Sequence, residues 1–463
     1  MTTLITQLSA IELMTLIQAR DLSPVEVTEA FLERILDTRT LSNAFVDIYE
    51  CQARAAAHRA CKAISRGQAS SSLHGMPIAL KDLFHVKGEL TTAGSLCWKH
   101  RRAQTTSTVV ERLLSKGMVI LGKTHTVEFG LGAFGVNEHF ATPRNPWSHR
   151  TALAPGGSSS GSAVAVASGL TPWALGTDTG GSVRIPASWC GVVGLKPSHG
   201  QIEMKDVVPL SQTLDSVGVL ARSVGDASLL YAHLLDEPTR QCLAANGERF
   251  GQVALNRYRV ATLPLHERPW VSADVLACYD TAIAVLRTLG IQTQTGVFPM
   301  PLEEYLKKNS LITFYEALAN YRTLHADAQS DLGESVRARL SRGAGISQAE
   351  YLNALQEMAT LRTLFERIYD QVEAIVLPTT QMPACAVDDI EHLAPPNHFT
   401  RFVNFLGLCA IAVPAGFTAD NRPCSLQFVC KRNQEHIALD LARAYEAQTP
   451  WHSIHPPAFL LPG

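Results

Sequence analysis

The chain has 463 residues, of which 46% are hydrophobic, and a formal net charge of −2 at pH 7. A chain of this length and composition can bury a large core, and its near-neutral charge gives no electrostatic reason to bind nucleic acid or an anionic membrane. It contains no run of 18 uncharged apolar residues, so we expect no membrane span. The first residues, MTTLITQLSAIEL, carry no cationic leader and include Glu12, which argues against a secretory signal.

The ten cysteines show no C-x-x-C spacing and lie mostly in apolar segments, which is typical of reduced thiols in a cytoplasmic protein. The sequence also lacks H-E-x-x-H and paired His or Cys ligands at zinc spacing. We therefore predict a cytoplasmic protein that needs neither a metal nor another cofactor.

Helix and strand patterns alternate along the whole chain. Expected helices cover residues 8–39 as two segments, 53–65, 109–115, the end of 213–235, 273–289, most of 301–370 with an interruption at 341–345, and 436–446. Expected strands include 43–48, 76–80, 118–121 and 372–377. Because strands are spread over the entire length without a clean linker, we expect an α/β fold in which residues 1–463 form one domain.

The strand pattern Met76–Leu80 runs directly into Lys81 and Asp82. A lysine at the end of a buried strand is unusual, because lysine is rarely buried unless it is paired or functional. The alternative is an ordinary ion pair in which Lys81 reaches the surface beside Asp82. The residues alone leave both interpretations open.

The sequence matches two nucleotide-binding patterns residue for residue. Residues 117–124 match G-x-x-x-x-G-K-[ST], but their four central residues are Met-Val-Ile-Leu and predict a strand where a phosphate loop is required. Residues 130–135 match G-x-G-x-x-G without a strand leading into them. We predict no nucleotide site, and we interpret 130–135 as a flexible loop that faces the substrate.

Two glycine-flanked serine turns, at 156–161 and 179–182, are separated by an alanine-rich helix pattern and an apolar strand pattern. Glycine beside a nucleophile permits backbone conformations that a β-carbon forbids, and it leaves peptide N–H groups open to a substrate. A flexible Gly/Ser linker has no use for the intervening Ala-Val-Ala-Val-Ala and Trp-Ala-Leu. The two turns therefore indicate a site built on serine hydroxyls.

With Lys81 and both turns in view, the chain resembles the amidase signature family. The resemblance is carried by Gly-Thr-Asp-Thr-Gly-Gly-Ser at 176–182 and Cys-Gly-Val-Val-Gly-Leu-Lys-Pro at 190–197. It implies a single α/β/α domain around a large, mixed, twisted sheet. The catalytic signature core would cover about 75–218, and a helical region on the substrate side about 265–370.

The family's catalytic set is a lysine, a serine in a cis peptide linkage and a nucleophilic serine, and these positions match Lys81, Ser158 and Ser182. The resemblance thus implies a cis bond between Gly157 and Ser158. We hypothesise that a buried, neutral Lys81 accepts a proton from Ser158, which relays one from Ser182 as Ser182 attacks the amide carbonyl.

The turn at 179–182 would also stabilise the oxyanion through its backbone N–H groups. The candidate donors are Thr179, Gly180, Gly181 and Ser182. Asp178 and Arg184 flank this turn, and we interpret them as a structural pair rather than as catalytic groups.

A Ser-His-Asp triad that uses Ser182 is an alternative mechanism. Sixteen histidines make a chance partner easy to find. The candidates are His74, His85, His125, His139 and His149. We favour the lysine-based set.

The predicted activity is hydrolysis of a small carboxamide to a carboxylate and ammonia or an amine, through an acyl-enzyme on the serine. Apolar and aromatic residues near the motifs favour an aryl or alkyl amide as substrate. The predicted substrate-binding residues are Phe129, Gly130, Leu131, Gly132, Trp189 and Phe405. A homodimer is compatible with the sequence.

The alternative function is the glutaminase (A) subunit of a tRNA-dependent amidotransferase, which shares the catalytic set. Those subunits carry a carboxylate shortly before an Asn-x-x-Gly stretch, where it holds the amino group of glutamine. The comparable segment here, Pro395–Phe399 before Asn404–Gly407, contains none, which favours the hydrolase. A non-catalytic binding protein is a third interpretation, disfavoured because all three catalytic positions are filled.

Overall fold

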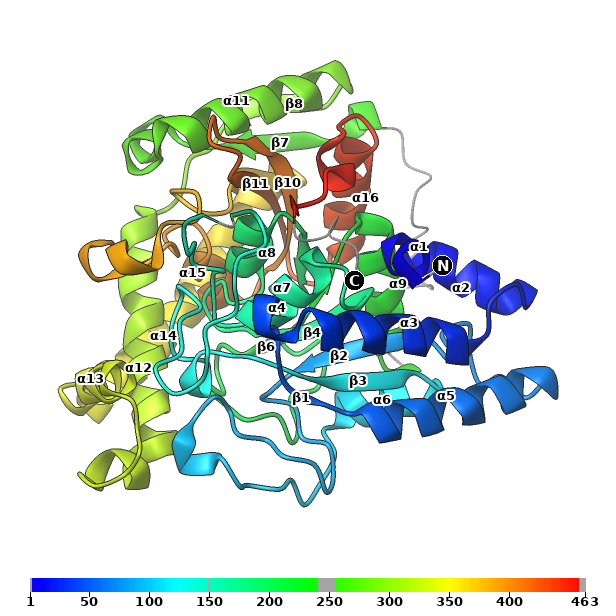
Figure 1. The fold of residues 1–463 in the computed structure, drawn as a ribbon. Coiled ribbons are helices and arrows are strands. Elements are labelled where there is room, and N and C mark those ends of the chain that lie inside the picture. The colour runs from blue at the N-terminus through cyan, green and yellow to red at the C-terminus, as the bar shows by residue number, and fades with distance from the viewer. Residues whose placement is uncertain (1, 149, 238, 240–254, 458–463) are drawn as a thin grey trace.

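The computed structural model describes residues 2–148, 150–237, 239 and 255–457. These residues are arranged around a mixed sheet of eleven strands, in the order β1-β3-β2-β4-β6-β5-β10-β11-β9-β7-β8 (Figure 1). The strands are β1 (Phe45–Ile48), β2 (Pro77–Lys81), β3 (Val119–Thr124), β4 (Trp173–Asp178), β5 (Val193–Lys196), β6 (Ser216–Ala221), β7 (Arg259–Thr262), β8 (Gln292–Thr295), β9 (Ala374–Pro378), β10 (Cys409–Phe417) and β11 (Pro423–Cys430). β2 is parallel to β3 and β4, β7 is parallel to β8 and β9, and the other neighbours are antiparallel. This mixed sheet confirms the predicted α/β fold class.

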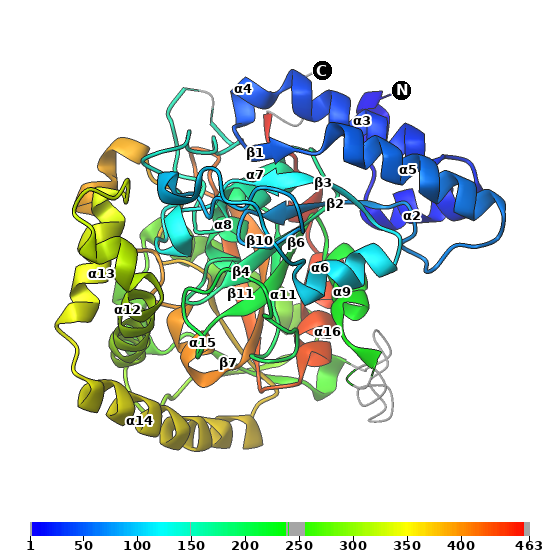
Figure 2. The same cartoon turned by 90° about the horizontal axis from the view of Figure 1, so that it is seen from below.

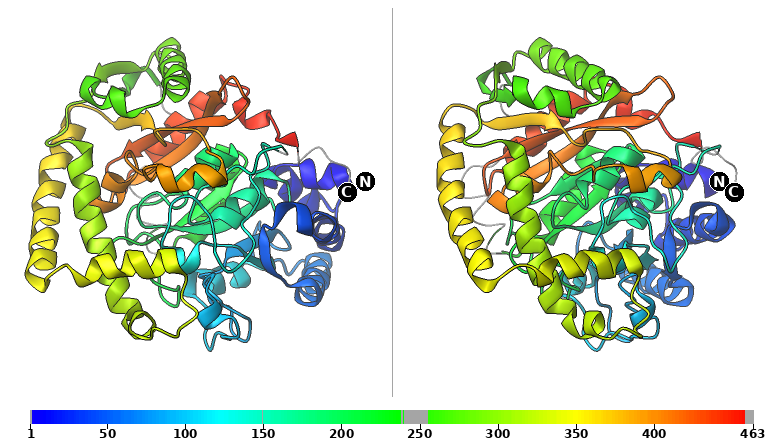
Figure 3. Two further views of the ribbon diagram at one scale, coloured as in Figure 1. Left: turned by 60° about the vertical axis from the view of Figure 1, so that its left-hand side comes forward. Right: turned by 90° about the vertical axis from the view of Figure 1, so that its left-hand side faces the viewer.

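Helices pack around the sheet. They are α1 (Thr2–Gln7), α2 (Ala10–Ala19), α3 (Pro24–Asp37), α4 (Arg39–Ser42), α5 (Glu50–Ser65), α6 (Thr108–Ser115), α7 (Ser160–Ala167), α8 (Arg184–Cys190), α9 (Val224–Leu234), α11 (Ala273–Thr288), α12 (Leu302–Ala326), α13 (Glu334–Ala344), α14 (Gln348–Glu366), α15 (Arg401–Leu406) and α16 (Glu435–Glu446). The N-terminal helices, in blue, lie on one side of the molecule, and α12 to α14, in yellow, stand on the other (Figures 2 and 3). α7 and α8 are buried along their whole length.

The ends of β2 and β4 bring two sequence motifs side by side. These strands are parallel neighbours, with Leu80 opposite Leu175. Their last residues, Lys81 and Asp178, therefore emerge at the same edge of the sheet, where ligands bind in many open α/β sheets. The second serine turn continues from β4 into α8, and the first leads into α7. Both turns are thus anchored by buried helices.

The helical region departs from the sequence prediction at one point. We expected an interruption at 341–345, but α13 continues through most of this stretch, and the breaks fall at 327–333 and 345–347. Gly343 lies inside α13 because its missing side chain lets this helix approach α12. A Cβ atom on Gly343 would lie 2.3 Å from the Phe314 carbonyl oxygen. Glycine marks a close helix contact here, and not a helix end.

The phosphate-loop pattern is a strand, as predicted, because residues 119–124 form β3. Lys123 would contact a phosphate in such a loop. Here its Nζ atom instead donates a hydrogen bond to the Asp82 carboxylate at 2.8 Å, and both side chains are buried. The pair leaves no phosphate cradle at this position.

The cysteines and the helix lengths can be examined in the described residues. All nine cysteines that the structure describes are free thiols, and Cys242 lies outside the described residues. In the same ranges, no helix has the length and apolar character needed to cross a membrane.

Gly161, in the first turn of α7, has no room for a side chain. A Cβ atom there would lie 2.4 Å from both the Ala44 carbonyl oxygen and the His125 backbone nitrogen. We expect Gly161→Ala to lower the free energy of unfolding by about 1–3 kcal/mol, because this clash outweighs the helix propensity gained with alanine. Denaturant unfolding measures the change. Gly345→Ala, where a Cβ atom meets nothing nearer than 3.8 Å, is the matched control, and equal stability of the two variants would contradict the packing argument.

Candidate active site

Lys81 ends β2 with its side chain fully buried. Its Nζ atom donates hydrogen bonds to Ser158 Oγ and Thr177 Oγ1, both at 2.8 Å. Asp82 belongs to a different cluster, in which its carboxylate accepts hydrogen bonds from Lys123 and Thr92. The interpretation of Lys81 and Asp82 as one surface ion pair is therefore wrong, since Lys81 contacts neutral hydroxyls in the interior.

The surroundings of Lys81 favour the neutral amine. Burial lowers the pKa of Lys81 to about 7, although the negative charges of Asp215 and Asp178 act in the opposite direction. The Asp215 carboxylate is itself bound by Thr179 Oγ1 at 2.5 Å and by two backbone N–H groups, and burial raises its pKa to about 6. The neutral form of Lys81 is therefore much more accessible near neutral pH than that of a lysine in water.

The first serine turn is fixed by backbone contacts on both sides. The Gly157–Ser158 peptide is cis, as the family resemblance implied. The Gly157 N–H donates to the Ala133 carbonyl at 2.7 Å, and the Ser159 N–H donates to the Ser182 carbonyl at 3.1 Å. The second of these bonds joins the two turns directly, so the predicted lysine and both predicted serines belong to one cluster.

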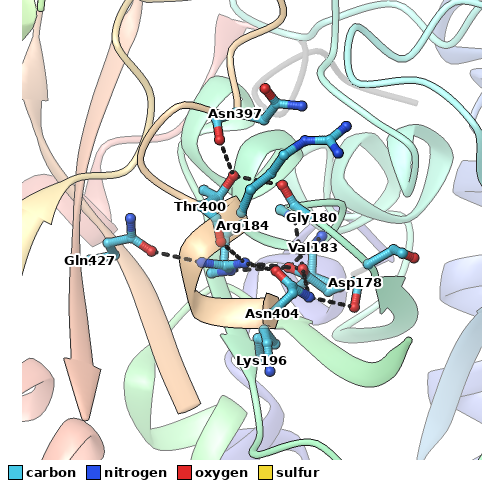
Figure 4. A network of polar contacts seen from close by, with 12 residues as sticks. Asp178, Gly180, Val183, Arg184, Lys196, Asn397, Thr400, Asn404 and Gln427 are labelled. Atoms are coloured by element: carbon cyan, nitrogen blue, oxygen red, sulfur yellow. Dashed lines mark hydrogen bonds and ion pairs between the residues drawn. The ribbon is translucent and has the colours of Figure 1, made fainter. Parts of the chain in front are cut away.

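A buried ion pair holds the second serine turn (Figure 4). Arg184 donates to the Asp178 carboxylate through Nε and Nη2, each at 3.1 Å, and both side chains are fully buried. The same carboxylate accepts from the backbone N–H groups of Gly181 at 2.7 Å and Val183 at 3.2 Å. Burial alone would raise the pKa of Asp178, but the Arg184 guanidinium holds it well below its usual range. The pair shapes the turn, in agreement with its structural interpretation.

Arg184 also ties the turn to distant parts of the chain. Its Nη2 atom donates to the Thr400 carbonyl at 3.0 Å and to Asn404 Oδ1 at 2.7 Å, and its Nη1 atom donates to Gln427 Oε1 at 2.9 Å (Figure 4). Asn404 Nδ2 in turn donates to the Asp178 carbonyl at 2.8 Å. β4, α8, α15 and β11 thus meet around one guanidinium.

This arrangement corrects one member of the predicted oxyanion set. The Gly181 N–H is bound to Asp178, so it cannot also serve a substrate oxygen, and Gly181 does not line the adjoining cavity. Thr179, Gly180 and Ser182 do line it. Within the described residues, no protein group accepts a hydrogen bond from the backbone N–H groups of these three.

A cavity of about 860 Å³ opens next to Ser182. Three of the predicted substrate-binding residues line it, namely Gly130, Leu131 and Gly132. The other three do not line it and are fully buried, namely Phe129, Trp189 and Phe405.

The three buried aromatic residues lie in the core behind the cavity wall. Phe129 stacks on Tyr321 with ring centroids 4.1 Å apart. Trp189 packs beside Phe134, whose side chain is the one that reaches the cavity. We therefore correct the predicted aromatic wall, because side chains that pack in the core leave no face for a substrate.

Much of the cavity wall comes from segments that carried no motif. Trp270 stacks on His398 with ring centroids 4.7 Å apart, and both line the cavity. Arg339 and Arg401 line it from α13 and α15. The sequence offered two signals for these segments, the helical pattern of 301–370 and the substrate-side region of about 265–370 that the family resemblance implied. Neither reveals which side chains meet a cavity.

The histidines considered for a Ser-His-Asp triad do not line the cavity where the structure describes them. These are His74, His85, His125 and His139, and His149 lies outside the described residues. The histidine that lines the cavity is His398, whose Nε2 atom forms a hydrogen bond with the buried Glu267 carboxylate at 2.7 Å. In the described part of the chain, no hydrogen bond joins Ser182 Oγ to a histidine.

A sequence model of the amidase family matches residues 26–439. The chain belongs to the amidase signature family. This amidase signature protein is accordingly an enzyme that hydrolyses amide bonds, as the motifs predicted.

Curated relatives of this amidase signature enzyme align with nearly its whole length. The (A) subunit of the glutamyl-tRNA(Gln) amidotransferase from Nitrosomonas europaea is 32% identical, over 96% of this chain and 98% of that protein. The corresponding protein of Symbiobacterium thermophilum is 34% identical, over 97% of this chain and 98% of that protein.

Solved structures include both hydrolases and an amidotransferase component. The crystal structure of an amidase has a TM-score of 0.86 and 28% identity, covering 95% of this chain and 100% of that chain. A 6-aminohexanoate cyclic dimer hydrolase has a TM-score of 0.85 and 25% identity, covering 98% and 99%. The (A) subunit of the glutamyl-tRNA(Gln) amidotransferase from Thermotoga maritima has a TM-score of 0.79 and 25% identity, covering 98% and 97%.

We expect Asp178→Ala to lower the free energy of unfolding by about 3–5 kcal/mol, because it leaves the buried Arg184 charge and two turn N–H groups without their acceptor. The matched control is Asp280→Ala, which removes a partly exposed ion pair with Arg268 at 2.7 Å and should cost less than about 1 kcal/mol. Urea unfolding of both variants measures the difference. Similar losses in the two would show that the buried pair does not hold the turn.

Proposed function

We propose that this enzyme hydrolyses the amide bond of a small carboxamide, with Ser182 as nucleophile, Ser158 as proton relay and Lys81 as base. The observation that carries the proposal is the fully buried Lys81 amine, 2.8 Å from Ser158 Oγ, with a pKa lowered to about 7. The backbone hydrogen bond between the two serine turns supports the relay, because it keeps the turns in contact beside the cavity.

In the acylation step, neutral Lys81 accepts a proton from Ser158 as Ser158 takes the proton of Ser182. Ser182 Oγ bonds to the carbonyl carbon, and the backbone N–H groups of Thr179, Gly180 and Ser182 stabilise the oxyanion. The carbon–nitrogen bond breaks as Lys81 returns its proton through Ser158 to the leaving nitrogen. Ammonia or an amine departs, and an acyl-enzyme remains.

Water completes the reaction through the same relay. Ser158 takes a proton from the attacking water and passes one to Lys81, while the water oxygen bonds to the acyl carbon. The bond between that carbon and Ser182 Oγ breaks, and the proton returns through Ser158 to Ser182. The carboxylic acid leaves and loses its remaining proton to solvent as it becomes a carboxylate, and the enzyme regains its starting protonation.

A second candidate function is the glutaminase role in a tRNA-dependent amidotransferase. The curated relatives support it more strongly than the stand-alone hydrolase, since those from Nitrosomonas europaea and Symbiobacterium thermophilum are amidotransferase components and align with nearly the whole chain. In this case the carboxamide is glutamine and the released ammonia is used within a complex. The chemistry at Lys81, Ser158 and Ser182 is common to both functions.

The cavity supports the stand-alone hydrolase. Among its described lining residues there is one carboxylate, Glu303, and it forms an ion pair with Lys307 at 3.1 Å. The ammonium group of glutamine would need a negatively charged partner inside the cavity. The segment in which such a carboxylate was expected presents Asn397 and His398 instead. An amide without an ammonium group is the better match for this lining.

The substrate-contacting wall is reassigned accordingly. Gly130, Leu131 and Gly132 remain proposed substrate contacts, because they line the cavity and a Cβ atom on Gly130 would lie 3.5 Å from Ser158 Oγ. The apolar contacts predicted for the core aromatic residues pass to Phe134 and Trp270, which line the same cavity.

The test is ammonia release by the purified chain from a panel of aryl, alkyl and amino-acid amides that includes glutamine. We expect Ser182→Ala and Lys81→Met each to lower kcat/KM at least about 10³-fold, because they remove the nucleophile and the base. Ser160→Ala is the matched control, since the buried Ser160 hydroxyl has no hydrogen-bond partner among the described residues. Activity that survives in Ser182→Ala would overturn the mechanism.

The same panel separates the two candidate functions. Turnover of simple amides by the chain alone would establish the hydrolase. Turnover of glutamine only, and only after partner amidotransferase subunits are added, would establish the glutaminase role in its place.

The reaction should depend on pH through Lys81. Its neutral form is the proposed base and its pKa is lowered to about 7, so kcat/KM should rise as the pH increases through about 7 and level off about one pH unit above. A series of buffers from pH 5 to 9 at constant ionic strength, with circular dichroism to confirm folding, gives the profile. A rate that falls as the pH rises through 7 would contradict a lysine base.

A further inference from the structure

Arg401 lies against the turn that carries the nucleophile. It is the first residue of α15 and lines the same cavity as Ser182. A Cβ atom on Gly180 would lie 3.2 Å from Arg401 Cγ and 3.4 Å from Arg401 Nε. Asn309 Nδ2 donates to the Thr179 carbonyl at 3.3 Å, and Asn309 Oδ1 accepts from Arg401 Nη1 at 2.8 Å. Arg401 therefore lies beside the turn, packed against Gly180 and linked to Thr179 through Asn309.

Neutral groups alone hold the Arg401 guanidinium. Besides Asn309, Nη1 donates to Ser310 Oγ at 2.9 Å. Nε and Nη2 donate to the side-chain oxygen of Asn397, at 2.8 and 3.1 Å, in the amide orientation that satisfies both residues. No carboxylate of the described residues forms an ion pair with Arg401. Burial lowers its pKa to about 10, so it stays a cation at neutral pH.

One N–H group of the Arg401 guanidinium has no acceptor among the described residues. A guanidinium has five N–H groups, and the contacts with Asn309, Ser310 and Asn397 use four of them. Arg401 is partly buried. Withdrawing a cation from water without a counter-charge is costly in proportion to its burial, and neutral acceptors offset that cost only in part. Arg184, by contrast, has a full carboxylate partner in Asp178. Arg401 is thus an arginine with a free donor and an unbalanced charge at the wall of the catalytic cavity.

The other charges of the described lining residues are mostly positive. Arg339 and Arg342 line it, and neither forms an ion pair with a carboxylate of the described residues. The one acidic lining residue, Glu303, is bound to Lys307, which also contacts Glu304 at 2.8 Å. The cavity therefore has an excess of positive charge, and such a cavity attracts an anionic substrate.

The location of Arg401 indicates which part of the substrate is anionic. The leaving nitrogen receives its proton from Ser158 and so must face the first serine turn. An acyl group that points away from the first serine turn would meet the second one, where Arg401 packs against Gly180. We propose that the acyl group carries a carboxylate that binds Arg401, so that the enzyme acts on monoamides of short dicarboxylic acids. This assignment rests on the function proposed for the same cavity.

The first test compares succinamate with succinamide, which have the same chain length and differ in charge. The wild-type enzyme should have the higher kcat/KM for succinamate. Arg401→Gln should lower the ratio of the two kcat/KM values about 10- to 100-fold, the effect of losing a charge-assisted hydrogen bond. Arg268→Gln, outside the cavity lining and paired with Asp280, is the matched control and should leave the ratio as it is.

Two results would overturn the assignment. One is a wild-type enzyme that does not prefer succinamate over succinamide, a comparison that needs no variant to fold. The other is a preference that persists unchanged in folded Arg401→Gln. Arg401→Lys keeps the positive charge and loses the forked donor, so its ratio should fall between those of the wild type and Arg401→Gln.

A binding measurement separates this assignment from the proposed reaction. Calorimetry with Ser182→Ala measures succinamate affinity without turnover, and adding Arg401→Gln should weaken it about 10- to 100-fold. Arg401-dependent binding by a protein that hydrolyses no amide would uphold the carboxylate site and overturn the proposed function. Turnover of neutral amides, with no effect of Arg401→Gln on succinamate affinity, would uphold the proposed function and overturn the carboxylate site.

Discussion

The buried pair of Asp178 and Arg184 is the interaction on which the site depends. The Asp178 carboxylate, at the end of β4, accepts hydrogen bonds from two backbone N–H groups of the second serine turn and balances the guanidinium at the start of α8. The guanidinium then reaches Asn404 and Gln427, more than 200 residues further along the chain. The geometry of the turn thus depends on the packing of the complete sheet. The site can take its shape only when the whole sheet has folded.

Three buried or partly buried cations serve different purposes because of the groups around them. Lys81 contacts two hydroxyls, and burial brings its pKa close to neutrality, so it can exchange a proton. Arg184 meets a carboxylate and serves as a fixed structural charge. Arg401 meets neutral acceptors among the described residues, and its proposed role is to bind the substrate carboxylate. Lysine suits the first position because its pKa responds to burial within the physiological range, whereas a guanidinium stays protonated.

The cluster of Lys81 and the two serine turns could be predicted from the sequence to a greater extent than the cavity lining. Lys81 and the two serines lie in short motifs at the ends of strand patterns, so local sequence was enough to bring them together. Gly181 was misassigned because its N–H partner follows from the three-dimensional form of the turn. The helix break predicted around Gly343 was misplaced for a similar reason. A glycine at a helix contact and a glycine at a helix end look alike in sequence.

We assigned the aromatic residues near the motifs to the cavity because the sequence does not distinguish an aromatic side chain in the core from one in a cavity wall. Phe129 and Trp189 pack in the core, and Trp270 reaches the cavity from a segment with no motif at all. Arg401 could not be recognised for a related reason. Its partners Asn309 and Asn397 come from separate segments, and only the folded chain brings them to one guanidinium.

Much of the cavity wall belongs to one excursion from the sheet. The chain leaves the sheet after β8 and returns at β9, and α12 to α14 occupy the interval (Figure 3). The residues of the proposed proton relay lie outside this excursion, on β2 and in the two serine turns that precede α7 and α8. Substitutions within 302–366 can therefore change which amides fit the cavity without replacing any residue of the proposed proton relay.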